Sequence, residues 1–530
     1  MSLARTPLVP RAPVASLAGG GVAAAVLALT LGSVGVVAWR AGGLPRPGAA
    51  DLAALRFTLV QAALSAALSV ALAVPVARAL ARRRFAGRGA LITALGAPFL
   101  MPVIVAVAGL LAVFGRAGPI SAALQAAGLA PLSIYGLHGV VLAHVYLNLP
   151  LAVRLILQGW QRVPSERLRL AAALDFGPAE MRAHVERPML RAVLPGAFVA
   201  IFAICLTSFA VALTMGGGPR ASTLELAIYQ AFRFEFDLGH AATLGLMQVG
   251  LCAGAALALF AVRAPAGMGA GLDRANTVPA PRGAAQRLDV AWIAAAAAFL
   301  MLPLVAVALR GAVALAAMPA GLAATLAAAA LRSAAVAGAA TALCIAAALA
   351  LALAAARAPA PRARAIEAVG MLPLAASPLV IGTALYLALF PLADPVALAL
   401  PVTALVNAAL ALPFALRALI PAARAAEADF GRLADSLGMT GAARLRHFVL
   451  PRLRAPLGFA AGLAAALSMG DLGVIALFAD PDRATLPMVV HHLMGAYRTE
   501  AAAGAALLLL VLSFAAFRAF DLWGRADADA

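Results

Sequence analysis

The sequence contains no lysine, so all 40 of its basic residues are arginines. A GxxxxGK[ST] loop cannot be present, and the chain therefore cannot bind ATP as P-loop proteins do. Charged residues are scarce, because they make up 12% of the 530 residues, against about a quarter in an ordinary soluble domain. If ATP drives this protein, a separate subunit must hydrolyse it, and we expect the chain itself not to be an enzyme.

Acidic residues and cysteines are also few. The 22 Asp and Glu residues leave a formal net charge of +18. The arginines lie in short loops between apolar segments rather than in one patch, which favours a membrane protein over a nucleic-acid-binding protein. Cys205, Cys252 and Cys344 have neither CxxC nor metal-ligand spacing, so we interpret them as packing residues. We expect no metal and no cofactor.

Apolar residues are abundant, at 64% of the chain with a mean hydropathy of +0.98. Many runs reach the roughly 20 residues that a helix needs to cross about 30 Å of hydrocarbon. The sequence therefore predicts an all-α integral membrane protein. The twelve predicted spans are 17–38, 55–80, 91–115, 137–158, 196–215, 241–262, 290–309, 327–356, 366–393, 396–419, 455–478 and 502–522. The first span could be a signal peptide, but it lacks a small-x-small cleavage site, which favours a retained span.

Arginine-rich loops alternate with arginine-poor ones along the chain. Because arginine in short loops stays on the cytoplasmic side, the alternation predicts that both termini are cytoplasmic. Segments 216–240 and 479–500 are then external, and they could receive a partner or be plain solvated loops. Their charged residues include Arg220, Glu225, Glu235, Asp237, Asp480, Asp482 and Arg483. His491 and His492 are adjacent, which is poor geometry for one metal ion.

The two halves of the sequence are similar to each other. Residues of the first half recur 263 positions later, as Pro150 does at Pro413 and Arg154 at Arg417. A segment rich in Pro and Gly separates the copies. We predict a first six-helix module at 1–262, a cytoplasmic linker at 263–289 and a second six-helix module at 290–530. Copies in the same direction predict modules related by a pseudo-twofold axis along the membrane normal.

The longest cytoplasmic connections, 162–191 and 421–454, share one plan. Each reads as two short helices laid along the membrane surface, with a break near Gly177 or Gly438 and a proline, Pro188 or Pro451, at the end. Such a projection could be held by a cytoplasmic partner. The alternative is an ordinary surface helix with arginines at the lipid headgroups.

These loops resemble the cytoplasmic EAA loop, EAA-x3-G-x9-I-x-L-P, of the inner-membrane components of bacterial binding-protein-dependent ABC importers. Aligning the final proline puts the glycine at Gly438 in the second copy and at Asp175 in the first, two residues before Gly177. Arg-Leu replaces Glu-Ala in both copies. The resemblance implies that these residues couple the chain to the ATPase: Arg169, Leu170, Ala171, Asp175, Phe176, Gly177, Pro188, Arg432, Leu433, Ala434, Gly438, Met439 and Pro451.

The resemblance extends over almost the whole chain and is to importers that carry both halves in one polypeptide. Segments 214–248 and 468–498 are most similar to permeases that import thiamine or thiamine pyrophosphate, although ferric-iron and phosphonate importers share the layout. The implied fold is that of type I ABC importers in the bacterial inner membrane. The implied partners are two copies of a cytoplasmic ATP-binding subunit and an extracytoplasmic solute-binding protein.

Asp471 is an acid within a predicted span, where a charge costs several kcal/mol unless it is paired, protonated or hydrated. Asp471 and Ser208, its counterpart in the first copy, are therefore candidates for the substrate path. Asp471 could instead cap a helix break at Gly470 or Gly473, or pair with an arginine. An ion-coupled secondary transporter would need more such residues, and a membrane enzyme would need a cluster of His, Asp or Glu at one depth.

Overall fold

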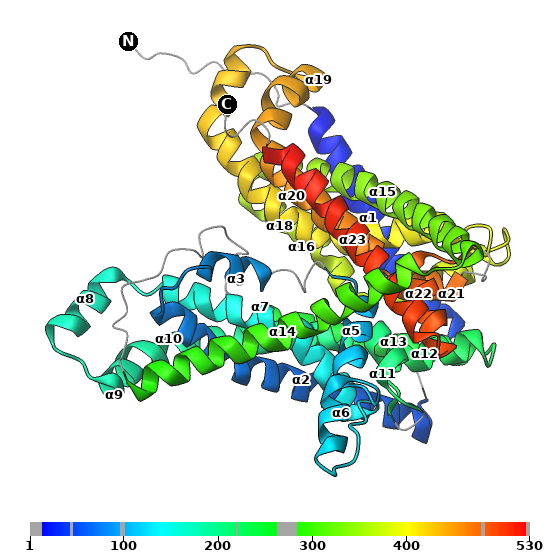
Figure 1. Cartoon of the computed structure of the whole chain (residues 1–530). Helices are drawn as coiled ribbons and strands as arrows, with labels where there is room; N and C mark the ends of the chain where they lie inside the picture. Colours follow the sequence, from blue (N-terminus) through cyan, green and yellow to red (C-terminus); the bar gives the residue numbers. More distant parts are fainter. Residues whose placement is uncertain are drawn as a thin grey trace.

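The computed structural model describes residues 13–42, 46–95, 101–218, 221–261, 283–478 and 483–525. Within these ranges the regular elements are helices and no strand occurs (Figure 1). Eleven of the described helices are long and apolar enough to cross a membrane, or twelve if one bent pair forms a single span. The predicted all-α membrane fold is thereby confirmed, and the predicted count of twelve equals the upper number.

The first half of the chain supplies the helices up to α13. Their bounds are α1 Pro13–Arg40, α2 Ala49–Arg82, α3 Arg88–Ala94, α5 Val103–Phe114, α6 Pro119–Ala126, α7 Leu137–Gln161, α8 Ser165–Ala173, α9 Pro178–Met181, η1 Arg182–Glu186, α10 Arg187–Leu206, α11 Phe209–Met215, α12 Leu224–Arg233 and α13 Leu238–Ala261.

The second half begins with α14, which starts inside the predicted linker; residues 263–282 of that linker lie outside the described ranges. Its elements are α14 Ala284–Ala316, α15 Ala320–Arg357, α16 Ala360–Met371, η3 Leu372–Leu374, α17 Pro378–Leu389, α18 Ala399–Ser436, α19 Gly441–Arg444, η4 Leu445–Val449, α20 Leu450–Met469, α21 Gly473–Phe478, α22 Leu486–Gly495 and α23 Thr499–Arg525.

The helices form two arms, and the first helix of each half lies on the arm of the other half (Figure 1). α1 packs mainly against α15 and α17 of the second half, and α14 packs against α2 and α5 of the first half as well as against α23 of its own half. The arms meet where α11, α12, α21 and α22 gather, and they diverge toward α8 and α9 on one side and α19 on the other. The two predicted coupling loops thus lie at the separated ends of the arms.

Four predicted spans are interrupted in the described residues. Span 91–115 contains the end of α3 at Ala94 and the start of α5 at Val103. Span 196–215 breaks between α10 and α11 at Ser208, whose backbone is extended, and span 455–478 breaks between α20 and α21 after Gly470. Span 366–393 bends by 86° before α17. At that bend Ser377 caps α17 by accepting hydrogen bonds from two backbone N–H groups, and Pro378 takes the first helical position.

Within each arm, glycines and hydroxyl side chains join neighbouring helices. Thr58 Oγ1 of α2 accepts a hydrogen bond from the backbone N–H of Leu224 at 2.9 Å. Ser333 Oγ of α15 accepts one from Leu486 at 2.8 Å. A Cβ at Gly458 would lie 2.5 Å from a carbonyl oxygen of α23, so only glycine allows α20 and α23 this close approach.

Candidate functional site

The break in each predicted cytoplasmic loop is made by one residue in the left-handed region. Asp175 has a φ of +50° and Gly438 a φ of +64°. In both halves the following N–H donates to the carbonyl four residues before the break, at 2.9 and 3.0 Å. Aspartate tolerates this region better than most residues do, so the first half retains the conformation of the EAA glycine without glycine. Gly177 is instead the extended N-cap of α9.

Next to each break, a pair of leucines one helical turn apart faces outward. Leu170 and Leu174 of the first half are each 60% exposed, and Leu433 and Leu437 of the second are 57% and 63% exposed. Each leucine of one pair lies 263 residues before its counterpart. The sequence predicted Leu170 and Leu433; the i, i+4 spacing from these could have identified Leu174 and Leu437 as well.

The other predicted loop residues differ in burial. Ala171 and Ala434 are buried below the leucines, and Arg169 and Arg432 are exposed. Phe176 is half-buried against the ring of His184, at 5.7 Å between ring centres. Arg169 forms an exposed ion pair with Glu166 at 3.1 Å. The pKa of Glu166 is lowered by its backbone hydrogen bond, by Ser165 and by Arg169.

The two loops are built differently from the prediction of two surface helices each. α8 is a separate short helix because Pro164, which lacks an N–H group, interrupts the chain after α7. In the second half Glu427 takes the equivalent position, and α18 runs without interruption for 38 residues. The second predicted helix of each loop continues through a π-helical turn into α10 or α20, where Pro188 and Pro451 lie in the first turn.

In the first half, an ion cluster fastens the loop to the end of α2. Glu186 of the π-turn η1 is buried, and its Oε2 lies 2.6 Å from Arg78 Nη2 and 3.8 Å from Arg82 Nη2. A buried carboxylate needs such cations, because removing either partner leaves an uncompensated charge.

The second half uses the same end of the equivalent helix. Arg357 follows Ser333 in α15 by the 24 residues that separate Arg82 from Thr58 in α2. Its Nη2 lies 2.9 Å from Glu427 Oε1 of α18.

This second cluster extends to Arg444 of α19. Arg444 is buried, donates to Glu427 at 2.8 Å and to Asp435 at 2.6 Å, and lies 5.0 Å above the ring of Phe448. Each loop is thus held to its own arm by buried ion pairs, through acids at different positions.

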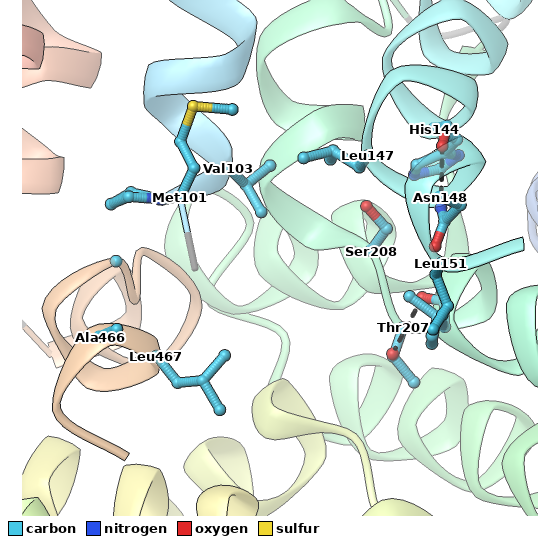
Figure 2. A pocket seen from close by; sticks show the side chains of 13 residues that line it. Met101, Val103, His144, Leu147, Asn148, Leu151, Thr207, Ser208, Ala466 and Leu467 are labelled. Atoms are coloured by element: carbon cyan, nitrogen blue, oxygen red, sulfur yellow. Dashed lines mark hydrogen bonds between the residues drawn. The ribbon is translucent and has the colours of Figure 1, made fainter. Parts of the chain in front are cut away.

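Between the arms, a cavity of about 280 Å³ is lined by residues of both halves (Figure 2). α5, α7 and the α10–α11 break supply one wall, and α20 supplies the other with Ala466, Leu467 and Gly470. Ser208, the predicted path residue of the first half, lines this cavity. Asp471 does not line it but follows Gly470, which does.

His144 and Asn148 are polar residues of α7 at the cavity wall that the sequence did not single out. His144 Nδ1 lies 3.3 Å from Ser65 Oγ, and its Nε2 has no hydrogen-bond partner among the described residues. Asn148 donates to the His144 carbonyl at 2.9 Å. Both residues lie within the predicted span 137–158, where polar side chains are rare unless they face a water-filled path. Their position in that span could have identified them from the sequence.

Asp471 lies in the α20–α21 break. Its Oδ1 accepts from the N–H of Gly473 at 3.2 Å, which is the capping contact considered above. Its Oδ2 is buried and has no hydrogen-bond partner in the described part of the chain. Asn407 of α18, the counterpart of His144, donates to Ser468 Oγ at 3.0 Å beside it. Capping therefore occupies only one of the two oxygens.

Known proteins are similar to this chain along almost its whole length. No family model matches it. It is 37% identical over 532 residues to the thiamine transport system permease protein of Brucella abortus, which covers 95% of this chain and 94% of the relative. The protein of the same name from Escherichia coli is 36% identical over 473 residues, covering 88% of each chain. That of Haemophilus influenzae is 32% identical over 500 residues, covering 89% and 88%.

The chain belongs to the thiamine transport system permease proteins. The resemblance to permeases of ABC importers is thereby confirmed, and this permease is a multi-pass membrane protein that serves in transport. Its sequence departs from the EAA motif at the glutamate and first alanine of both copies. The family relation rests on the full length of the chain rather than on that motif.

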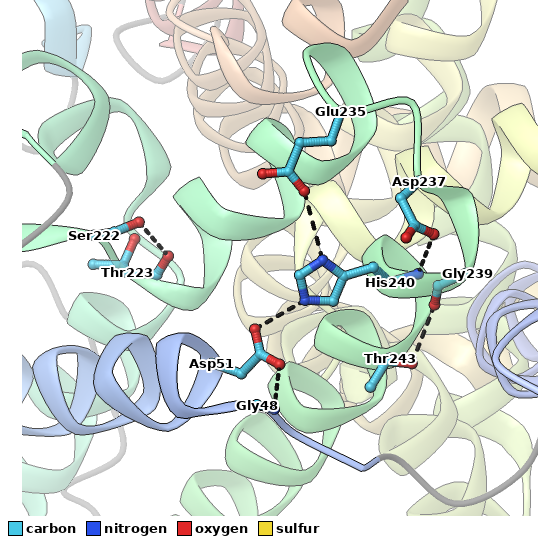
Figure 3. A network of polar contacts seen from close by, with 9 residues as sticks. All are labelled: Gly48, Asp51, Ser222, Thr223, Glu235, Asp237, Gly239, His240 and Thr243. Carbon is cyan, nitrogen blue, oxygen red and sulfur yellow. Dashed lines mark hydrogen bonds and ion pairs between the residues drawn. The ribbon is translucent and has the colours of Figure 1, made fainter.

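On the predicted external side of the permease, one polar network joins α2 to α13 (Figure 3). His240 Nε2 lies 2.9 Å from Asp51 Oδ1, and the other Asp51 oxygen accepts from the N–H of Gly48 at 2.8 Å. Glu235 Oε2 lies 3.7 Å from His240 Nδ1, and Asp237 caps the start of α13. Two of the predicted external acids thus hold the start of α13.

The remaining external candidates do not share one environment. Arg483 donates to the carbonyl of Val396 at 3.2 Å. Arg220, Asp480 and Asp482 lie outside the described residues. Glu225 is fully buried rather than solvated, because segment 224–233 folds back into the permease as α12.

Proposed function

We propose that this chain is the transmembrane permease of an ATP-driven importer for thiamine or thiamine pyrophosphate. Solute would pass from an extracytoplasmic binding protein through the space between the two arms to the cytoplasm. The substrate class comes from the names of relatives that match along nearly the whole chain. The modules would be 1–262 and 290–530, joined by a cytoplasmic linker at 263–289, with both termini cytoplasmic.

The observation that carries the ATP-driven mechanism is the pair of matched leucine surfaces. Two exposed leucines recur in each half beside a left-handed break, at the ends of the arms and away from the predicted spans. Exposed apolar groups that recur in this way fit two identical partner subunits. Because the chain has no lysine and hence no P-loop, these partners would supply ATP binding and hydrolysis.

Alternating access would follow from the arrangement of the arms. The arms diverge toward the coupling loops and converge at α12 and α21, which corresponds to an inward-facing state (Figure 1). An ATPase dimer that binds the closed arrangement more tightly would draw the loops together and open the other end. Thr207, Ser208, His144 and Asn148 would contact solute in the cavity, with the free Asp471 oxygen beside them.

The test is ATPase activity of the permease purified with its ATPase and binding protein in lipid. Thiamine, thiamine pyrophosphate, ferric iron and a phosphonate are added separately. We expect only a thiamine compound to stimulate hydrolysis severalfold. Stimulation by another ligand would replace the substrate, and failure of any ATPase to bind would overturn the ATP-driven mechanism in favour of an ion-coupled transporter.

A further inference from the structure

Glu225 is a buried carboxyl group that the proposed transport path does not use. It lies in the first turn of α12, its exposed fraction is 0%, and neither of its oxygens completes a hydrogen bond with the described residues. An ionised carboxylate without a cation in such surroundings is strongly disfavoured. A structural reason for Glu at this position must therefore come from its polar neighbours.

Those neighbours belong to both halves of the chain. Gln248 of α13 and Ser377, the N-cap of α17, lie beside the Glu225 carboxyl group. The contact between halves continues along α12, since Phe232 lies on the same face two turns later and its ring packs 4.5 Å from that of Tyr386 in α17. Glu225 is therefore part of the junction at which the two arms meet.

Counting donors and acceptors indicates how many protons this site holds. Gln248 Nε2 donates to the carbonyl of Leu206 at 3.0 Å and to Cys252 Sγ at 3.6 Å, so both of its N–H groups are used and Oε1 is the atom left without a donor. Ser377 Oγ already accepts from two backbone N–H groups, at 3.2 and 3.4 Å, and is left with an O–H to donate. A group between them must accept one hydrogen bond and donate one. A neutral carboxylic acid does both, whereas a carboxylate leaves the amide oxygen unpaired.

The titratable groups on the elements around Glu225 do not provide a cation for it. In the described part of the chain none of them is paired with its carboxyl group. They are Tyr229 and the exposed Arg233 on α12, Cys252 and His240 on α13, Asp51 and the exposed Arg56 on α2, Tyr386 on α17 and Asp471 before α21. His240 and Asp51 neutralise each other at the outer end.

We propose that Glu225 is a proton-binding site that links the two halves of the permease while the arms are joined at this end. The inference rests on the proposed alternating-access function. When this end opens, Ser377 moves away and water enters; the carboxyl O–H bond then breaks, the proton passes to external water and a hydrated carboxylate remains. External pH thus sets the balance between the two states, and alkaline pH favours the state that is open to the outside.

The first test is infrared spectroscopy of the full-length permease alone in lipid at pH 6. A protonated carboxyl group gives a C=O stretching band that a carboxylate lacks. We expect Glu225→Gln to remove one such band from the wild-type spectrum, and Glu500→Gln, at an exposed acid, to remove none. Identical spectra for wild type and Glu225→Gln would overturn the proposal.

The second test measures the separation of the arms through spin labels on cysteines introduced at Leu174 and Leu437. Burial raises the pKa of Glu225 to about 7 while the arms are joined, so between pH 5 and pH 7 we expect the wild-type population with widely separated loops to fall, by up to about tenfold per pH unit, and to change little above that range. Glu225→Gln, which imitates the neutral acid, should keep that population constant. A pH response in Glu225→Gln equal to that of wild type would overturn the proposal.

Glu225→Asp separates a lost titration from a folding defect. The variant retains a titrating carboxyl group and should therefore retain a pH response. A folded Glu225→Asp variant without any pH response would contradict the proposal. Both measurements use the permease without ATPase or solute. If the chain proves not to serve in ATP-driven import, both measurements can still be interpreted. If both measurements contradict the proton-binding site, the proposed import mechanism is unaffected.

Discussion

Asp175 and Gly438 illustrate how a conformation can be kept while the residue changes. Both lie in the left-handed region, which costs a residue with a Cβ roughly 1–2 kcal/mol and costs glycine nothing. Aspartate reduces this cost by local hydrogen bonding. The position therefore needs a particular backbone and not a particular side chain, which explains why the motif is incomplete in the first half.

This argument predicts the effect of a β-branched residue in the second loop. Gly438→Val should cost the loop about 1–2 kcal/mol and weaken binding of the ATPase subunit roughly 5- to 30-fold. Gly177→Ala is the matched control, because Gly177 has an ordinary φ of −69° and an added Cβ would meet only the flexible Glu180 side chain. Binding is measured with the purified subunit; equal losses in both variants would refute the conformational explanation.

The exposed leucines give a second prediction at single residues. Leu174→Ala and Leu437→Ala should each lower the affinity for the ATPase subunit by about tenfold, which is about 1.4 kcal/mol. Leu129→Ala, an equally exposed leucine between α6 and α7 on the predicted outer side, should change nothing. Titration of the ATPase subunit against each variant in lipid decides this, and an unchanged affinity in both loop variants would exclude the leucine surfaces as its binding site.

Among the structural elements, the ends of α2 and α15 perform the same task with different acids. Each presents an arginine to an acid of its own coupling loop, Glu186 after the break in one half and Glu427 before it in the other. The loops are therefore rigidly joined to long helices of their arms. Movement imposed on a loop would be transmitted to the bundle rather than absorbed at the joint.

The buried cluster should be much more sensitive to mutation than the exposed ion pair. Arg444→Ala leaves Glu427 with Arg357 as its one cation and removes the partner of the exposed Asp435, and it should destabilise the permease by about 1–3 kcal/mol. Arg169→Ala removes a fully solvated pair and should leave the stability almost unchanged. Thermal unfolding in one detergent compares them, and similar midpoints would show that the cluster does not stabilise the loop.

Sequence patterns predicted these elements unevenly. Apolar length identified the spans. The 263-residue offset and the resemblance to the EAA loop together predicted two coupling loops, with Asp175 and Gly438 at corresponding positions in them. The patterns did not predict the break at Ser208, because a broken membrane helix keeps the apolar composition of a whole one. They raised the break at Gly470 only as one alternative, through the acid at Asp471 beside glycines. Nor did they predict the burial of Glu225, since polar residues in a short segment between spans indicate solvent unless their hydrogen-bond partners are known.

At the scale of the whole molecule, the two halves are held together chiefly because the first helix of each half packs on the other half. α1 packs mainly on helices of the second half, and α14 packs on α2 and α5 of the first half as well as on α23 of its own, so each half completes the other. Periodicity within a helix carries no information on which arm it joins, and the sequence therefore could not predict this arrangement. It implies that the halves are held together by packing and not only by the connecting segment.

Cutting the chain tests this interlocking. Fragments 1–272 and 273–530, expressed together, should assemble and purify as one complex from membranes. A second fragment shortened to 320–530, which lacks α14, should be recovered with the first at a much lower yield. Equal recovery with and without α14 would show that the crossover contributes little to assembly.

Pro164 makes the two arms mechanically unlike. In the second half α18 is one continuous helix of 38 residues, about 57 Å long at 1.5 Å per residue. It runs from the predicted span 396–419 into the predicted coupling loop. In the first half the chain is interrupted at Pro164 between α7 and α8, so a movement of α8 reaches the bundle through the ion pairs of Glu186 with α2 rather than along one continuous helix. Two identical ATPase subunits would therefore move the two arms through different connections, one continuous helix in the second half and an ion cluster in the first.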